Sequence, residues 1–149
     1  MKSIVIYYSQ SGNTEKIAQA VAAGLGIKAS KLEDINPDTL KNYDLIIIGS
    51  PVHGGAPNKK VTKFISQMPN MPGKKGALFC TKSIAGDKPA IATMRKGIEA
   101  KGMRFAGSYC AVGLSRFIGD FGPRIFHRGH PSKEELVKAE EFGRGLIER

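Results

Sequence analysis

Short runs of apolar residues alternate along this chain with longer segments in which apolar residues recur every three or four positions. The apolar runs, which predict five β-strands, lie at residues 4–8, 27–32, 44–49, 76–80 and 105–112. The run from Leu45 to Ile48 is apolar at every position, which is typical of a central parallel strand buried on both faces. Strands that alternate with helices predict a parallel α/β sheet with right-handed crossovers.

Helical periodicity fills most of the segments between the predicted strands. The predicted helices lie at residues 14–25, from about 58, from about 89 and after 132. The last helix has a clear start signal, because Ser132 and Glu135 have the spacing of a capping box. Residues 113–130 have no helical period and are rich in glycine, and a connection of that length is usually functional or mobile.

Length and composition favour one globular domain over residues 1–149, with a hydrophobic fraction of 41%. We find no signal peptide and no apolar stretch long enough for a membrane span, so we expect a cytoplasmic protein. The net charge of +10 favours acidic partners. No nucleic-acid motif surrounds the densest basic group, which we interpret as a solvated helix face and its exit loop, formed by Lys59, Lys60, Lys63, Lys74 and Lys75.

The chain has two cysteines, Cys80 and Cys110, and neither lies in a CxxC motif or a cluster with metal-ligand spacing. We therefore predict no metal site. We interpret both cysteines as buried strand residues near the ends of strands expected to be neighbours. A redox pair between them is the alternative.

Ligands of open parallel sheets bind beyond the carboxyl ends of the strands. Four loops leave such ends, at residues 9–14, 50–57, 81–87 and from 113 onwards. The first reads SQSGNT, and its hydroxyls and amides at a helix N-terminus would hold a phosphate. It matches neither GxxxxGK[ST] nor GxGxxG, which argues against an NTPase and a dinucleotide site. An ordinary serine-capped helix entry is the alternative.

The chain begins with a predicted strand, the sequence SQSGNT and a predicted helix, and GSPVHGG follows the third strand. In these features it resembles the flavodoxin family over essentially its whole length. The resemblance implies a doubly wound, five-stranded parallel sheet in the order 2-1-3-4-5, with FMN bound non-covalently. It implies a phosphate site formed by Ser9, Gln10, Ser11, Gly12, Asn13 and Thr14. It implies a flavin ring bordered on one side by Pro51, Val52, His53, Gly54 and Gly55, and on the other by Thr81, Lys82, Ser83 and Gly86.

The chain departs from the family pattern in charge and in aromatic residues. Flavodoxins are typically acidic and place aromatic residues on both faces of the ring, whereas this chain is basic, has no Trp and has no aromatic residue in its second or third loop. His53 could contact the ring or face solvent. Phe117, or Phe121 beside it, could cover the flavin or form a small hydrophobic cluster beneath its loop.

Three functions remain compatible with these residues. The first is an FMN-binding flavoprotein that carries electrons between redox partners, and we expect those partners to dock through acidic surfaces. The second is a flavin-dependent oxidoreductase that acts on NAD(P)H and quinones or on a small aromatic such as a porphyrinogen. The third is a binding module that keeps the fold without a flavin. No nucleophile–base pair stands out, so we assign no catalytic residue and favour the carrier.

Overall fold

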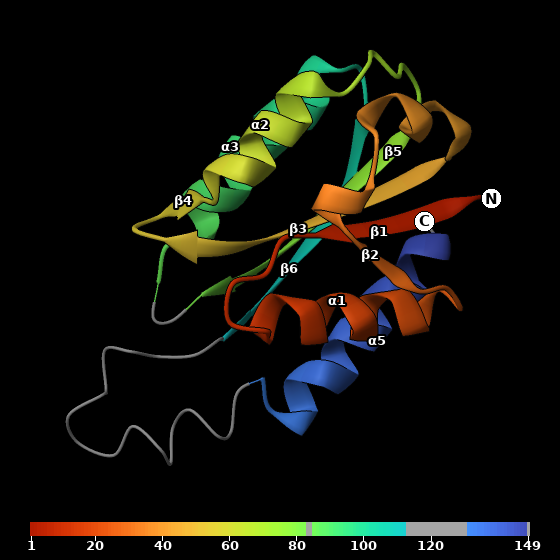
Figure 1. Ribbon diagram of the computed structural model, residues 1–149. Helices are drawn as coiled ribbons and strands as arrows, with labels where there is room; N and C mark the ends of the chain where they lie inside the picture. Colours follow the sequence, from red (N-terminus) through yellow and green to blue (C-terminus); the bar gives the residue numbers. More distant parts are fainter. Residues whose placement is uncertain (83–84, 113–130, 149) are drawn as a thin grey trace.

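A parallel β-sheet forms the centre of the computed structural model, which describes residues 1–82, 85–112 and 131–148 (Figure 1). The sheet strands are β1 (Ser3–Tyr7), β2 (Ala29–Lys31), β3 (Leu45–His53), β5 (Lys75–Lys82) and β6 (Arg104–Val112). They follow the order β2-β1-β3-β5-β6, and every neighbouring pair is parallel. A two-residue strand, β4 (Ala56–Pro57), pairs antiparallel with the end of β3. Apart from β4, this is the order predicted from the sequence.

Helices cover both faces of the sheet. Helices α1 (Asn13–Gly24) and α5 (Lys133–Ile147) pack on one face, and α2 (Lys59–Gln67) and α3 (Asp87–Ala100) pack on the other (Figure 1). Two short 3₁₀ helices that the sequence analysis did not predict, η1 (Leu32–Asp34) and η2 (Pro37–Asn42), follow β2. In the portion of the chain described, no helix is long and apolar enough to cross a lipid bilayer.

Local signals fix the ends of several helices. The capping box at α5 is confirmed, because the Ser132 hydroxyl accepts from the Glu135 amide at 3.1 Å and the Glu135 carboxylate accepts from the Ser132 amide at 2.9 Å. Asn58 caps α2, since its side-chain oxygen accepts from the Lys60 amide at 2.8 Å. These caps satisfy amides that have no partner within the helix.

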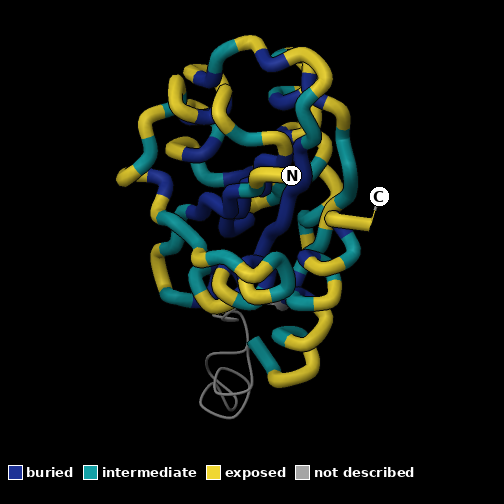
Figure 2. Tube along the Cα trace, turned by 90° about the vertical axis from the view of Figure 1, so that its right-hand side faces the viewer, coloured by how far each residue is buried: buried dark blue, intermediate teal, exposed yellow. Residues whose placement is uncertain are grey.

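Strand β3 divides the core into two layers. Ile46 and Ile48 face the layer under α2 and α3, whereas Leu45 and Ile47 face the layer under α1 and α5. All four side chains are 0% exposed, which confirms the predicted burial on both faces. Figure 2 shows this buried centre in dark blue. Burial of one such aliphatic side chain stabilises the fold by about 1.5–3 kcal/mol.

The backbones of α1 and α5 lie in direct contact at two glycines. A Cβ atom on Gly143 would collide with the carbonyl oxygen of Val21, and one on Gly24 would collide with the carbonyl oxygen of Glu140. No side chain fits at either position without separating the helices. This contact fixes α1 against the C-terminal helix, and α1 begins at the first ligand loop.

We expect Gly143→Ala to lower the free energy of unfolding by about 1–3 kcal/mol, because the added methyl group overpacks the α1–α5 contact. Gly145→Ala in the same helix is the matched control. A Cβ on Gly145 meets no atom within 4 Å, so this change should stabilise the helix by about 0.5–1 kcal/mol. Urea denaturation followed by circular dichroism measures both. Equal effects of the two substitutions would contradict the close helix contact.

Candidate functional site

The loops that follow β1, β3 and β5 meet at the carboxyl edge of the sheet, on the left of Figure 1. Two side-chain hydrogen bonds join them. The hydroxyls of Thr14 and Thr81 lie 2.8 Å apart and connect the first loop to the third. His53 Nε2 lies 3.0 Å from Gln10 Oε1 and connects the second loop to the first. Three of the four loops predicted from the sequence are therefore joined at this edge, and the fourth, from residue 113, lies outside the described residues.

Gly12 shapes the first loop and forms the N-cap of α1. Its φ of 91° lies in the left-handed region, which glycine tolerates far better than other residues. The Ser9 hydroxyl accepts from the Gly12 amide at 3.0 Å, and no side chain caps the first turn of α1. Asn13 is the first helical residue and is 8% exposed.

The first turn of α1 is suited to an anion. Its amides have no side-chain cap, and the position where a Cβ on Gly12 would lie has no atom within 4 Å. Amides at a helix start attract negative charge through their N–H groups and the helix dipole. Ser11 is exposed beside them. These features fit the phosphate monoester that the sequence predicted there.

Thr14 and Thr81 are buried at this edge, with 2% and 5% of their surfaces exposed. Within the pair, one hydroxyl donates and the other accepts, so one O–H group of the pair remains able to donate elsewhere. The family resemblance implies a place at the phosphate for Thr14 and at the ring for Thr81, and it does not imply that the two residues touch. Their contact adds a structural role to both.

A tight hairpin forms the second loop. Gly54 and Gly55 have φ values of 58° and 78°, and they connect His53 to its β-sheet partner Ala56. Positive φ at both central residues is the signature of a type I′ turn, which demands residues such as glycine. The double glycine was the sequence signal for this hairpin, which was not predicted.

Ser50 fixes the base of this loop and was missed as a site residue. Its hydroxyl donates to the Pro51 carbonyl at 2.8 Å and accepts from the Asn58 amide at 2.9 Å. The side chain is 0% exposed, so these bonds form away from water. A small hydroxyl residue at the end of a fully buried strand was the available signal.

The side chains of the second loop point in different directions. Val52 is 4% exposed and packs against Cys80 and Ala90, and Pro51 is also buried. His53 is exposed and bonds to Gln10. Of these three side chains, the imidazole of His53 is the one that a bound molecule could reach directly. Pro51 and Val52 can contribute backbone groups.

The third loop touches the second through glycine backbones. Gly86 is the N-cap of α3 with φ 99°, and a Cβ there would lie 2.8 Å from the Cα of Gly55. No other residue type would allow this approach without a shift of the loop. Ser83 and Phe117, which we also predicted at the site, lie outside the described residues.

One charge pair among the described residues lies at the third loop. The Lys82 ammonium lies 3.0 Å from Asp87 Oδ1, and this bond holds the pKa of Asp87 below its usual value. Near the first loop, Tyr7 donates to a Glu15 carboxylate oxygen at 3.2 Å, and burial followed by the charge of Glu15 raises the pKa of Tyr7. Over the described ranges, no three His, Cys, Asp or Glu side chains gather to hold a metal ion.

Cys80 and Cys110 lie on the neighbouring strands β5 and β6, as expected, but only Cys80 is fully buried, and the two form a disulfide, which was the alternative. The register of β5 and β6 sets the two residues directly opposite each other, with Cα atoms 4.6 Å apart. That separation is within the range that a disulfide spans. Cys80 directly precedes Thr81, so the disulfide lies next to the third loop in sequence.

Comparison with known proteins identifies relatives over most of the chain. The model of the Flavodoxin domain family matches residues 4–113. An uncharacterized protein of Methanocaldococcus jannaschii is 30% identical over 152 residues, covering 99% of both chains. A flavodoxin of Clostridium saccharobutylicum is 30% identical over 69% of this chain and 71% of its own. An NAD(P)H dehydrogenase (quinone) of Archaeoglobus fulgidus is 26% identical over 97% and 95% of the two chains.

Solved structures share the fold. Oxidised flavodoxin 1 of Bacillus cereus superposes with a TM-score of 0.76 at 21% identity, covering 100% of this chain and 99% of its own. A flavoprotein of Lactobacillus acidophilus, solved in complex with FMN, gives a TM-score of 0.59 at 24% identity, covering 73% and 92% of the two chains. At these identities the likeness shows the fold alone.

The Thr14–Thr81 hydrogen bond predicts a non-additive pair of substitutions. We expect Thr14→Val and Thr81→Val each to lower the free energy of unfolding by about 1–2 kcal/mol, because each leaves one buried hydroxyl without its partner. The double variant should lose clearly less than the sum, since it leaves neither hydroxyl behind. Urea denaturation of all four proteins measures the coupling. Simple additivity would show that the two hydroxyls act independently.

Proposed function

Since the chain belongs to the flavodoxin family, we propose that it binds FMN at the carboxyl edge of its sheet and carries electrons between redox partners. The observation that carries the proposal is the convergence of three loops on one edge, linked by the Thr14–Thr81 pair beside a helix start without a side-chain cap. FMN bound there would supply one-electron and two-electron chemistry, and the protein would supply binding, orientation and electrostatics.

The first loop is the proposed phosphate site. The amides of Asn13 and Thr14 would donate to the phosphate oxygens, together with the Ser11 hydroxyl and the O–H left over by the Thr14–Thr81 pair. Ser9 shapes the loop, since its oxygen already accepts from the Gly12 amide. No lysine or arginine is required, because backbone dipoles offset the negative charge.

The second and third loops are the proposed ring site. Their closest approach is between the backbones of Gly55 and Gly86, where the absence of side chains leaves peptide groups able to meet polar atoms of a ring. His53 borders this region and is oriented by Gln10. Lys82 contributes little net charge there, because Asp87 offsets it.

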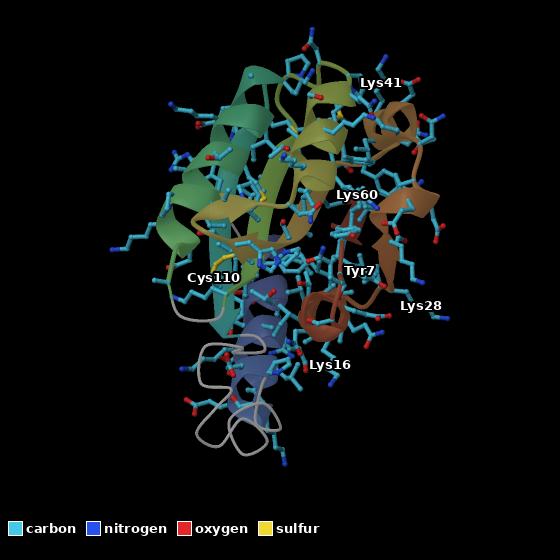
Figure 3. All side chains as sticks on the ribbon, turned by 60° about the vertical axis from the view of Figure 1, so that its left-hand side comes forward. Tyr7, Lys16, Lys28, Lys41, Lys60 and Cys110 are labelled. Atoms are coloured by element: carbon cyan, nitrogen blue, oxygen red, sulfur yellow. A yellow bond between two sulfur atoms is a disulfide. The ribbon has the colours of Figure 1, made fainter. Side chains whose placement is uncertain are left out.

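The basic surface favours an acidic redox partner. Lys59, Lys60 and Lys63 are exposed on α2. Lys60 is labelled in Figure 3, and its ammonium lies 5.0 Å from the centre of the Tyr8 ring, next to the first loop. Cations around a binding edge raise the rate of encounter with an anionic surface, and salt weakens the effect. We propose that the partner is a redox protein with a complementary acidic face.

Titration with FMN and with riboflavin tests the proposed site. We expect the wild type to quench FMN fluorescence on binding and to bind riboflavin more weakly, because riboflavin lacks the phosphate. Ser11→Ala should weaken FMN binding by about 1.5–3 kcal/mol through the loss of a hydrogen bond to a charged group. Riboflavin binding should not change in this variant.

Ser66→Ala is the matched control for this titration. Ser66 is an exposed serine on α2 whose hydroxyl donates to the Lys63 carbonyl at 2.6 Å. Its substitution should leave the affinities for FMN and for riboflavin unchanged. A protein that takes up no FMN, or one that binds riboflavin as tightly as FMN, would refute the flavin site. The third hypothesis from the sequence, a binding module that keeps the fold without a flavin, would then remain.

A flavin-dependent NAD(P)H–quinone oxidoreductase is the second candidate, favoured by the Archaeoglobus fulgidus relative. Steady-state assays of the FMN-loaded protein separate the two functions. A carrier should oxidise NAD(P)H in the presence of a quinone only after a separate flavin reductase is added, because a carrier has no site that holds NAD(P)H against its flavin. Turnover with NADPH and a quinone alone would replace the carrier by the oxidoreductase.

A further inference from the structure

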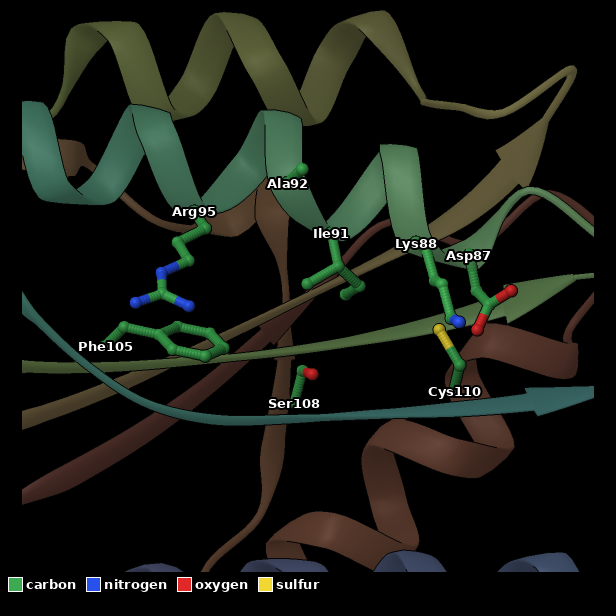
Figure 4. Close-up of a pocket in the computed structure, with 8 residues that line it drawn as sticks. All are labelled: Asp87, Lys88, Ile91, Ala92, Arg95, Phe105, Ser108 and Cys110. Carbon is green, nitrogen blue, oxygen red and sulfur yellow. The ribbon is translucent and has the colours of Figure 1, made fainter.

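A shallow groove of about 530 Å³ runs between α3 and the edge strand β6, and Cys110 lies at one end of it (Figure 4). The sulfur of Cys110 is bonded to that of Cys80. The groove lies on the α3 face of the sheet, whereas the proposed flavin site lies at the loop edge. Its lining includes Lys88, Ile91, Arg95, Phe105, Ser108 and Cys110.

An irregularity in β6 brings the lining together. The ladder between β5 and β6 shifts register between Gly76 and Ala77, which pair with Phe105 and Gly107 and leave Ala106 as an extra residue. Gly107 there has φ 149°, which suits glycine. Phe105 and Cys110 are an odd number of residues apart and would face opposite sides of a regular strand. The bulge places both on the groove side.

The two sulfur atoms differ in accessibility. Cys80 is 0% exposed in the core, whereas Cys110 is partly exposed and lines the groove. A nucleophile can therefore reach the Cys110 sulfur from the groove and cannot reach that of Cys80. In an exchange at this site, Cys110 would take the incoming sulfur and Cys80 would leave.

The chemistry of the groove favours a thiol that carries negative charge. Lys88 extends toward the end where Cys110 lies (Figure 4). Arg95 lies 4.2 Å from the centre of the Phe105 ring and pairs with Glu99 at 3.3 Å. The carboxylate of Asp87 is already held by Lys82. The groove thus combines an apolar wall of Ile91 and Phe105 with one lysine, Lys88, at the end where the Cys110 sulfur lies (Figure 4).

We infer that Cys80–Cys110 is a redox-active disulfide that exchanges with small, carboxylate-bearing thiols bound in this groove. The thiolate attacks the Cys110 sulfur, the disulfide bond breaks, and Cys80 leaves and takes up a proton. A second thiolate attacks the bound thiol's sulfur and releases Cys110. Two small thiols become one disulfide, and the protein gains two thiols, so electrons and protons balance.

Reduction of the folded wild type is the first test. Thiol counting in denaturant should find no free cysteine in the air-oxidised protein. It should find both cysteines free after the native protein has been incubated with mercaptosuccinate. Circular dichroism must show that the protein stays folded throughout. Two free thiols at the start, or a disulfide that mercaptosuccinate opens only in denaturant, would overturn the proposal.

Single-cysteine variants test which sulfur reacts. In Cys80→Ser the remaining Cys110 should react with dithiobis-nitrobenzoate, an anionic disulfide, at least about 10-fold faster than Cys80 does in Cys110→Ser, because the latter sulfur is buried. Comparable rates in two folded variants would contradict attack from the groove. If either variant fails to fold, the wild-type reduction still decides the proposal.

Lys88 provides the test of charge selectivity. Added to Cys80→Ser, Lys88→Gln should slow the reaction with dithiobis-nitrobenzoate about threefold, since one unit charge at ~6 Å in water changes the encounter by that factor. The neutral reagent dithiodipyridine should be slowed clearly less, because it shares only the effect of the lysine charge on the Cys110 thiolate. Lys96→Gln, an exposed lysine of α3 outside the groove, is the matched control. Equal slowing of both reagents, or no slowing of either, would refute an anionic thiol as the preferred ligand.

Discussion

The buried hydrogen bond between Thr14 and Thr81 is the interaction on which the carboxyl edge depends. It joins the start of α1 to the end of β5, and its two residues lie 67 positions apart in the sequence. Both residues are buried, so water does not readily replace either hydroxyl as the hydrogen-bond partner of the other. The second loop is then positioned by its own hairpin, by the Gln10–His53 contact and by the backbone contact of Gly55 with Gly86. Three loops of different construction thus form one surface.

Elements with strong periodicity were predictable because each was long enough to show its pattern. The four apolar residues of β3 and the capping box of α5 are examples, and the strand order followed from the family resemblance. Strand β4 was missed because two residues carry no periodicity. The disulfide was not assigned because pairing of Cys80 with Cys110 depends on a register shift near Ala106 that alternation cannot reveal. Ser50 was missed because its role is to bond backbone groups, which no residue motif marks.

The charge distribution separates the proposed binding edge from the surface around it. The chain carries a net charge of +10, yet Lys82 at the third loop is matched by Asp87, and Lys74 at the opposite end of β5 lies 3.6 Å from Asp44. The exposed lysines of α2 stand on the α2–α3 face. The long-range field of the protein therefore acts on approaching molecules, while Lys82, the lysine of the third loop that the structure describes, adds little net charge to that loop.

The glycine contact between α1 and α5 has a consequence at the far end of α1. Because the last turn of α1 contacts the backbone of α5 directly, α1 cannot tilt without separating the backbones of the two helices. The amides of its first turn therefore keep one direction in the absence of any ligand. Their ordering entropy is lost during folding, so an anion that arrives there meets preorganised dipoles and needs little structural rearrangement.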